Sequence, residues 1–210
     1  MRSSVDLRRV FSKSFAKAIA PLGFFPTEQM LYERQRGELR DIVAAGPRSA
    51  PRGLALGLGS VGLVLPAVEQ LRSRLNLTER NATVAIGLHL LLPDKQFREW
   101  SVSTVADIDE VVPYMLDTLK DAGLPFLESF KTVADLKRKL GEPDPALWFM
   151  CSQDARGVIL VLLEAIDSGL QAAIGLCERL LAELAERPPK YSHELRTLLG
   201  ALNASGASLG

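Results

Sequence analysis

The feature that most constrains the fold is the stretch LALGLGSVGLVLP, residues 54–66, in which Gly57 to Gly62 have the G-x-G-x-x-G spacing of a dinucleotide-binding loop. In such a loop the second glycine opens a helix whose amide groups hold the pyrophosphate. Here leucines alternate with small residues, which indicates an extended strand, and Pro66 suits the first position of the next helix. No acidic residue ends a strand about 20 positions further on, as a ribose contact requires. We therefore predict a close-packed strand and no cofactor.

Other short apolar runs predict further strands. Residues 30–35 and 38–43 flank Arg36-Gly37, which reads as a hairpin. A two-residue loop there would place Glu33 opposite Arg40, and a bulge at Gly37 would shift that register by one residue. Alternation over residues 82–92 predicts a strand with His89 on one face, and residues 99–104 predict a short strand.

Helical spacing dominates both ends of the chain. Residues 5–20 form an amphipathic pattern that Pro21 and Gly23 end. Asp107 and Glu110 have the spacing of a capping box, before a helix that Gly123 closes. The same capping pattern recurs later, and three further helices follow. The residues concerned are Thr132 with Asp135, Gly141 at the end of that helix, and the later ranges 158–166, 170–184 and 193–202.

Strands placed early and helices placed late predict an α+β fold. We expect an N-terminal helix, an antiparallel sheet of about four to five strands with helices packed on it, and a C-terminal helical segment. The segment GEPDP, residues 141–145, is the best candidate boundary. We accordingly predict an α+β domain over residues 1–142 and a C-terminal helical extension over residues 143–210 that packs on it.

The charge balance bears on the partners. Lys and Arg number 25, and so do Asp and Glu, so no overall field attracts nucleic acid or an anionic membrane. The most apolar stretch, residues 157–166, is far shorter than the ~20 residues that span a bilayer. Cys151 and Cys177 form no C-x-x-C pair, which favours reduced thiols over a disulfide or a metal site. We predict a cytoplasmic protein with no metal and no cofactor.

The order of elements resembles a known bacterial family. The segments PLGF (residues 21–24), YER (residues 32–34), W-x-V (residues 100–102) and DAGLPFLESF (residues 121–130) are similar to patterns of domain-of-unknown-function family 4304. The resemblance covers residues 5–140 and implies an α+β fold, without an activity, cofactor or catalytic residue. The glycine-rich strand departs from the family pattern.

Five residues are candidates for a binding site. Tyr32, Arg34 and Arg36 alternate along one predicted strand, so they share a face that could contact bases, but a solvated strand face with ordinary charges is the preferred interpretation. His89 shares its strand face with small residues, where a cleft could form. Trp100, on the last predicted strand, completes the set.

These observations favour a non-enzymatic bacterial protein that binds another protein, of the kind an immunity protein or antitoxin forms with its toxin. One alternative is a small-molecule enzyme, such as a hydrolase, with a cleft near His89. Its partner nucleophile has no G-x-S-x-G motif to mark it. A second alternative is a nucleic-acid-associated module that uses Arg34 and Arg36. The C-terminal helices either cover the sheet or form an interface, including one between two copies of the chain.

Overall fold

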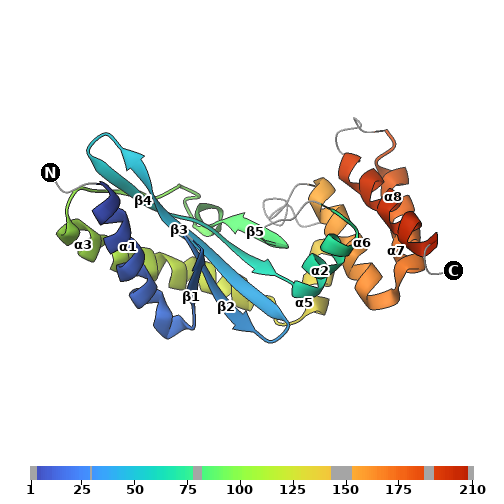
Figure 1. Ribbon diagram of the computed structural model, residues 1–210, viewed down its shortest axis with the longest axis horizontal. Coiled ribbons are helices and arrows are strands. Elements are labelled where there is room, and N and C mark those ends of the chain that lie inside the picture. The colour runs from blue at the N-terminus through green and yellow to red at the C-terminus, as the bar shows by residue number, and fades with distance from the viewer. Residues whose placement is uncertain (1–3, 29, 78–81, 143–152, 187–191, 208–210) are drawn as a thin grey trace. The chain divides into compact units, whose positions relative to one another are not determined.

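The computed structural model describes residues 4–28, 30–77, 82–142, 153–186 and 192–207 (Figure 1). The chain forms two compact units, which we describe separately. Unit 1 contains residues 1–63 and 85–131, and unit 2 contains residues 64–84 and 132–210. The predicted boundary at residue 142 differs from this grouping, because residues 64–84 and 132–141 belong with the C-terminal helices. That the two predicted segments fold as separate domains stays a prediction.

A six-stranded sheet confirms the predicted α+β class. The strands follow the order β1-β2-β3-β4-β5, and β6 also pairs with β4. The pairs β1/β2, β2/β3 and β4/β6 are antiparallel. The bounds are β1 Phe25–Glu28, β2 Leu31–Arg36, β3 Leu39–Ala50, β4 Gly53–Val64, β5 Val84–Gly87 and β6 Glu99–Val102.

The glycine-rich stretch lies within β4, as predicted from its alternation. The strand continues through Gly62, and helix α2 (Pro66–Arg74) begins at the proline. A Cβ atom on Gly57 would stand 3.4 Å from the ring of Phe97, an ordinary van der Waals distance, so Phe97 lies over the strand at this glycine. The helix that a dinucleotide loop requires at the second glycine is not formed in this segment.

The hairpin has a different register from the predicted one. The loop residues are Gly37 and Glu38, so Arg36 pairs with Leu39 and Glu33 pairs with Ile42. Gly37 has φ 58°, a left-handed conformation that glycine adopts without a steric penalty. Strand β1 was not predicted. It forms the sheet edge, which is where a strand tolerates Pro26, since no neighbour needs its missing N–H.

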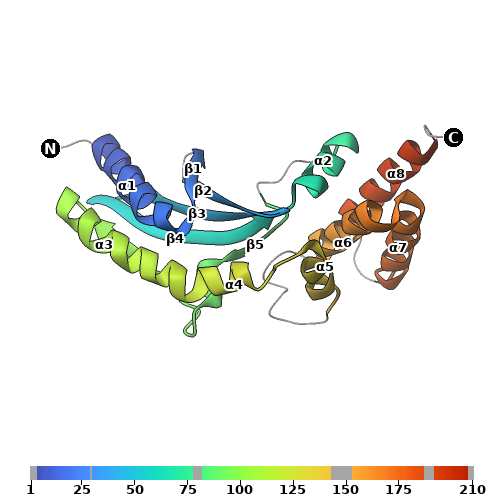
Figure 2. The ribbon, with the colours of Figure 1, turned by 90° about the horizontal axis from the view of Figure 1, so that it is seen from below.

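Two helices of unit 1 lie side by side against the sheet (Figure 2). They are α1 (Ser4–Ile19) and α3 (Val105–Thr118), and the buried side chains Phe11, Phe15 and Met115 lie between them and the strands. The left-handed Gly23 ends the 3₁₀ turn η1 (Ala20–Leu22) after α1, as its sequence predicts.

Two predictions about helix α3 were wrong. Its capping box is formed by Thr104 and Asp107, not by Asp107 and Glu110. Thr104 is a better N-cap because its hydroxyl accepts from the Asp107 amide while the Asp107 carboxylate accepts from the Thr104 amide. Gly123 does not close the helix: a π-helical turn η3 (Leu119–Gly123) leads directly into α4 (Leu124–Glu128).

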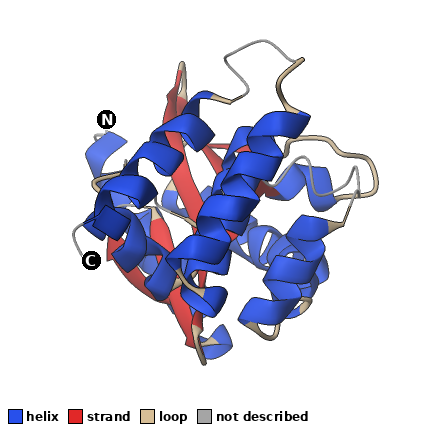
Figure 3. Cartoon of the chain, turned by 90° about the vertical axis from the view of Figure 1, so that its right-hand side faces the viewer, coloured by secondary structure: helices blue, strands red, loops and turns tan. Residues whose placement is uncertain are grey.

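Unit 2 contains helices packed around a shared apolar core. Helix α6 contacts α2, α5, α7 and α8. The predicted cap of α5 is confirmed, with Thr132 as N-cap and Asp135 as its partner. Every described strand ends by Val102, and the chain beyond it is helical in its described parts (Figure 3). The helix bounds are α5 Val133–Gly141, α6 Gln153–Ser168, α7 Leu170–Glu183 and α8 His193–Ala207. Residues 143–145 of the predicted boundary lie outside the described residues.

Candidate functional site

A buried carboxylate brings together two of the predicted site residues. Asp41 on β3 has no exposed surface, and both of its oxygens accept hydrogen bonds from arginines on β2. Arg34 donates to Oδ2 from Nε at 2.9 Å and from a terminal nitrogen at 2.7 Å. Arg36 donates to Oδ2 from Nε at 3.0 Å and to Oδ1 from a terminal nitrogen at 2.8 Å. The three residues form an arginine–aspartate cluster on the sheet face that carries Tyr32.

The same arginines also satisfy backbone carbonyls. Arg36 donates to the carbonyls of Leu127 and Phe130 at the end of α4, at 2.9 and 2.7 Å. Arg34 donates to the carbonyl of Leu22, and its guanidinium carbon lies 4.8 Å from the centroid of the Phe24 ring. These contacts tie the sheet to two helix ends. The predicted role of Arg34 and Arg36 in nucleic-acid binding stays a prediction, and the contacts that the structure shows for them are internal.

Tyr32 lies one strand position away and packs under helix α1. Its side chain is 2% exposed, and its ring meets Phe15 edge to face at a centroid distance of 5.0 Å. Burial raises the pKa of the phenol, and a hydrogen bond with Ser12 offsets part of that rise. The hydroxyl is therefore neutral at physiological pH and available as a donor.

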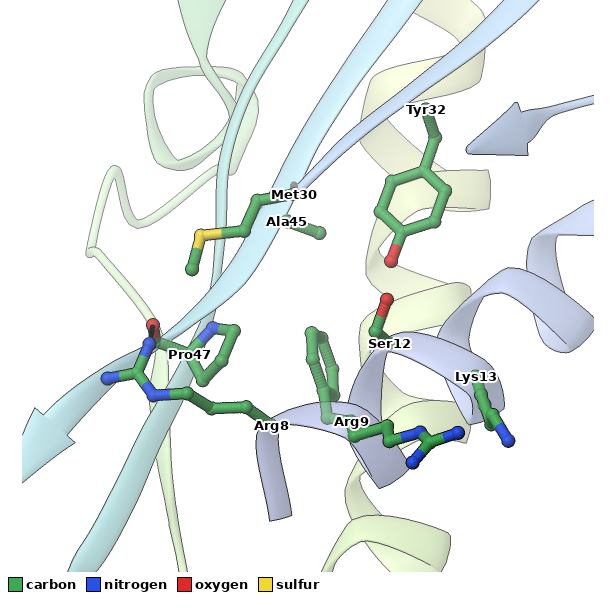
Figure 4. Close-up of a pocket in the computed structure, with 9 residues that line it drawn as sticks. Arg8, Arg9, Ser12, Lys13, Met30, Tyr32, Ala45 and Pro47 are labelled. Carbon is green, nitrogen blue, oxygen red and sulfur yellow. Dashed lines mark hydrogen bonds between the residues drawn. The ribbon is translucent and has the colours of Figure 1, made fainter. Parts of the chain in front are cut away.

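This hydroxyl faces a cavity of about 450 Å³, the Tyr32 pocket (Figure 4). Its walls come from α1, from the start of β2 and from β3. The inner walls are largely apolar, and three cationic side chains lie along α1. The lining residues are Arg8, Arg9, Phe11, Ser12, Lys13, Met30, Tyr32, Ala45 and Pro47.

The three cations of this pocket are held differently from those at Asp41. Arg8 donates to the carbonyl of Pro47 at 3.1 Å and to the Ser49 hydroxyl at 3.0 Å, so it crosses from α1 to β3. Arg9 and Lys13 are exposed and form no ion pair with any described carboxylate. The pocket therefore combines an apolar interior with two cations that no described carboxylate neutralises.

Met30 at the edge of this pocket has a strained backbone. Its φ is 71°, which is uncommon for a residue with a side chain. Its side chain is 36% exposed although it is large and apolar. Strain of this kind costs of order 1–3 kcal/mol and is found most often at binding and switch regions.

Sequence reasoning missed Arg8, Arg9 and Lys13 as site residues. A signal for them existed: Arg9, Lys13 and Lys17 follow one another at four-residue steps. Like charges at that spacing destabilise an isolated helix by a few tenths of a kcal/mol. A stripe of this kind is unfavourable unless a negative charge neutralises it.

Trp100 lines a second cavity of about 550 Å³, the Trp100 pocket. The cavity lies among β6, the chain after the 3₁₀ turn η2 (Leu88–Leu91), α3 and the π-helical turn η3. Tyr114, Asp117, Thr118 and Asp121 face it from the helix side. Tyr32 and Trp100 thus belong to separate pockets, and the structure does not bring them together.

The predicted position of His89 was wrong. Strand β5 ends at Gly87, and His89 lies in η2, so it shares no strand face with Ala85 and Gly87. Its ring meets Phe97 edge to face at a centroid distance of 5.6 Å, and its Nδ1 is buried without a hydrogen-bond partner. His89 lines neither the Tyr32 pocket nor the Trp100 pocket.

The described part of unit 2 holds one of the two cysteines. Cys177 is fully buried, and its thiol donates to the carbonyl of Leu195 at 3.4 Å. Burial raises the pKa of this thiol to about 11, which makes it a weak nucleophile. Cys151 lies outside the described residues.

Within the described ranges, no group of three or more His, Cys, Asp or Glu side chains could hold a metal ion. None of the described helices is both long and apolar enough to cross a membrane.

Comparison with protein-family models, with curated proteins and with solved structures finds no match to this chain. The resemblance to family 4304 therefore stays a prediction.

Proposed function

We propose that this chain is a non-enzymatic binding protein whose Tyr32 pocket receives an acidic segment of a protein partner. The observation that carries the proposal is the combination of Arg8, Arg9 and Lys13 with an apolar interior. Concave sites with apolar walls and a few placed polar groups are the usual form of a binding pocket.

Charge supports an acidic occupant. A carboxylate beside Arg9 and Lys13 would relieve the repulsion between these neighbouring charges on α1. Complementary charges at the rim of an interface mainly raise the association rate and select the partner. The chain as a whole has no net charge, so this attraction is local to the pocket.

The interior supports an apolar anchor next to the acid. Met30 is the exposed apolar residue of the lining, next to the buried Phe11 and Pro47, and the protonated Tyr32 hydroxyl can donate to a carbonyl or carboxylate. A partner segment in which acidic and apolar side chains alternate would use both parts of the pocket.

An immunity or antitoxin role is the narrower form of this proposal, with a toxin as the acidic partner. It predicts that co-production of this chain with the toxin restores growth. The R9Q/K13Q variant should fail to restore it.

The broader form can be tested with a fluorescein-labelled peptide of alternating Glu and Leu, next to a matched peptide of Gln and Leu. We expect the first to bind and the second to bind at least about tenfold more weakly, a factor equal to 1.4 kcal/mol. The R9Q/K13Q variant should bind the Glu peptide more weakly by a similar factor, and its affinity should depend less on salt concentration. The control K17Q/R74Q removes the same charge at exposed residues that do not line the pocket.

Equal losses in the two double variants would mean that general electrostatics and not the pocket drives binding. Equal binding of the two peptides would also contradict the proposal. Either outcome is read only after the circular dichroism of each variant matches that of the parent chain.

A further inference from the structure

The Trp100 pocket has the opposite character from the Tyr32 pocket. Trp100 stands on β6, where its backbone pairs with Leu56 of the long strand β4, so the indole is carried by the sheet. Across the cavity, Tyr114 is 63% exposed although it is a large aromatic residue. Because Tyr114 also lines the cavity, its ring is accessible to a ligand there.

Two carboxylates share this cavity. Asp117 and Asp121 both line it, one helical turn apart on α3 and η3. Asp117 has only a long ion pair, with Lys120 at 3.9 Å, and Asp121 pairs with no described cation. Like charges at this spacing are unfavourable in an isolated helix, as they are on α1.

The helix that carries them has a local irregularity. The backbone changes from α-helical to π-helical at Leu119, so Asp121 and Ala122 of the cavity wall belong to the π turn. Single π turns within α-helices are rare and occur frequently at functional sites. In this chain the turn is continuous with α4, so it is not a frayed end.

One cation already lies in the wall. Arg98 lines the cavity, and its guanidinium contacts Asp94 at 3.3 Å. Because Asp94 is not a lining residue, this pair engages Arg98 from outside the cavity. Asp117 and Asp121 therefore line the same cavity as the two aromatic side chains without a close ion pair to a described cation.

We propose that the Trp100 pocket binds an alkylammonium cation, held by Asp117 and Asp121 and covered by the rings of Trp100 and Tyr114. Aromatic faces attract organic cations through the ring quadrupole, and Trp is the strongest of them. Carboxylates next to such rings add a full charge. Two carboxylates are too few to hold a bare metal ion, since no group of three or more such side chains is found among the described residues, and the aromatic rings favour an organic cation.

An alkylammonium group has two sources, a free polyamine or a lysine side chain of another protein. The chain allows a direct test, because Trp100 and Trp148 are its only tryptophans. The W148F variant leaves Trp100 as the single indole fluorophore. We would titrate it with spermidine and, separately, with N-acetyl-lysine methylamide.

We expect saturable changes in Trp100 fluorescence with one probe or both, and the tighter probe identifies the source. Adding D117N/D121N to W148F should weaken binding at least about tenfold. The matched control D109N/E183Q removes two exposed carboxylates that do not line this cavity and should leave the affinity unchanged. Y114A is a second, uncharged test, with an expected loss of about threefold to tenfold.

If neither probe saturates the fluorescence change up to about 10 mM, the dissociation constant is too high for a specific site, and the proposal is overturned. Equal affinity in the D117N/D121N and D109N/E183Q backgrounds would also overturn it. This test is independent of the acidic peptide, so failure of one pocket leaves the other proposal standing.

Discussion

Unit 1 carries two groups of cations whose surroundings differ. Arg34 and Arg36 meet a fully buried carboxylate and the carbonyls of helix ends, and their side chains are 16% and 26% exposed. Arg9 and Lys13 stand on the rim of a pocket and meet no described carboxylate. The first group uses its charge to join elements of the fold, whereas the second leaves its charge available to a ligand.

The difference shows why residue type alone is a poor guide to a binding site. Both groups lie at regular spacing on a single element, two residues apart on β2 and four apart on α1. What separates them is Asp41, which reaches the arginines only through the β2/β3 pairing. A charge is free for function when the fold supplies no partner, and that is a tertiary property.

The largest expected effect is at the arginine–aspartate cluster. Asp41→Asn should lower the free energy of unfolding by about 3 kcal/mol, because two partly buried guanidinium groups lose their buried countercharge and keep only the exposed Glu128, 3.9 Å from Arg34. The measurement is urea unfolding followed by circular dichroism. Glu33→Gln is the matched control, since Glu33 pairs with Arg40 at 3.1 Å on the same two strands. It should cost no more than about 1 kcal/mol. Similar costs for the two variants would mean that the cluster is not structural.

A smaller effect is expected at the floor of the Tyr32 pocket. Tyr32→Phe keeps the ring contact with Phe15 and removes only the hydroxyl, which bonds to Ser12. The loss of one such hydrogen bond should cost about 1 kcal/mol of unfolding free energy. If the hydroxyl instead serves the ligand, affinity for the Glu/Leu peptide should fall while Ser12→Ala leaves it unchanged. A cost above about 3 kcal/mol would place Tyr32 with the structural group.

The parts of the fold that the sequence predicts correctly depend on local chemistry. The alternation around Gly57, the proline at the start of α2 and the capping pair of α5 need no distant partner. The errors arise where a distant contact decides the outcome. His89 has the sequence pattern of a strand but lies in a 3₁₀ turn, where its ring contacts Phe97. Pro26 is tolerated in β1 only because β1 is an edge strand.

The candidate site follows the same rule. Tyr32 and Trp100 were singled out on their strands, and each lines a pocket. The other lining residues of the two pockets could not be predicted from sequence. The cations of α1 approach Tyr32, and the aspartates of α3 and η3 approach Trp100, only when the helices pack on the sheet. The internal role of Arg34 and Arg36 depends on Asp41 of β3. The observed register places Asp41 opposite Arg34, whereas the predicted register of this hairpin was wrong.

The acidic residues of unit 1 differ in the same way. Asp107 has a structural role in a capping box, whereas Asp117 and Asp121 line the Trp100 pocket. Hydrogen bonds from Ser103 and Thr104 lower the pKa of Asp107 to about 2. Because this pKa is depressed in the folded state, the carboxylate stabilises the fold above about pH 4, and that contribution is lost as the pH falls toward 2. Asp107→Asn should therefore lower the melting temperature at pH 7 and differ little from the parent chain near pH 2. Glu110→Gln, at the residue that the sequence wrongly paired with Asp107, removes an exposed side chain outside the capping box and should leave the melting temperature at pH 7 close to that of the parent chain.

The smallest expected change in stability is at the rim of the Tyr32 pocket, and it is the one that most sharpens the comparison. Arg9→Gln with Lys13→Gln removes two exposed charges that have no described ion-pair partner, so no buried group is left unpaired. Unfolding free energy should change by less than about 0.5 kcal/mol, as exposed substitutions usually do. A slight gain is expected at low salt, because the stripe of like charge on α1 is shortened. The measurement is urea unfolding at low and at high salt, alongside Asp41→Asn.

A loss of stability as large as that of Asp41→Asn would mean that these cations hold the fold together. The distinction between cations that join elements of the fold and cations available to a ligand would then fail. A variant that keeps its stability and loses the acidic peptide would place Arg9 and Lys13 among the residues that serve binding alone.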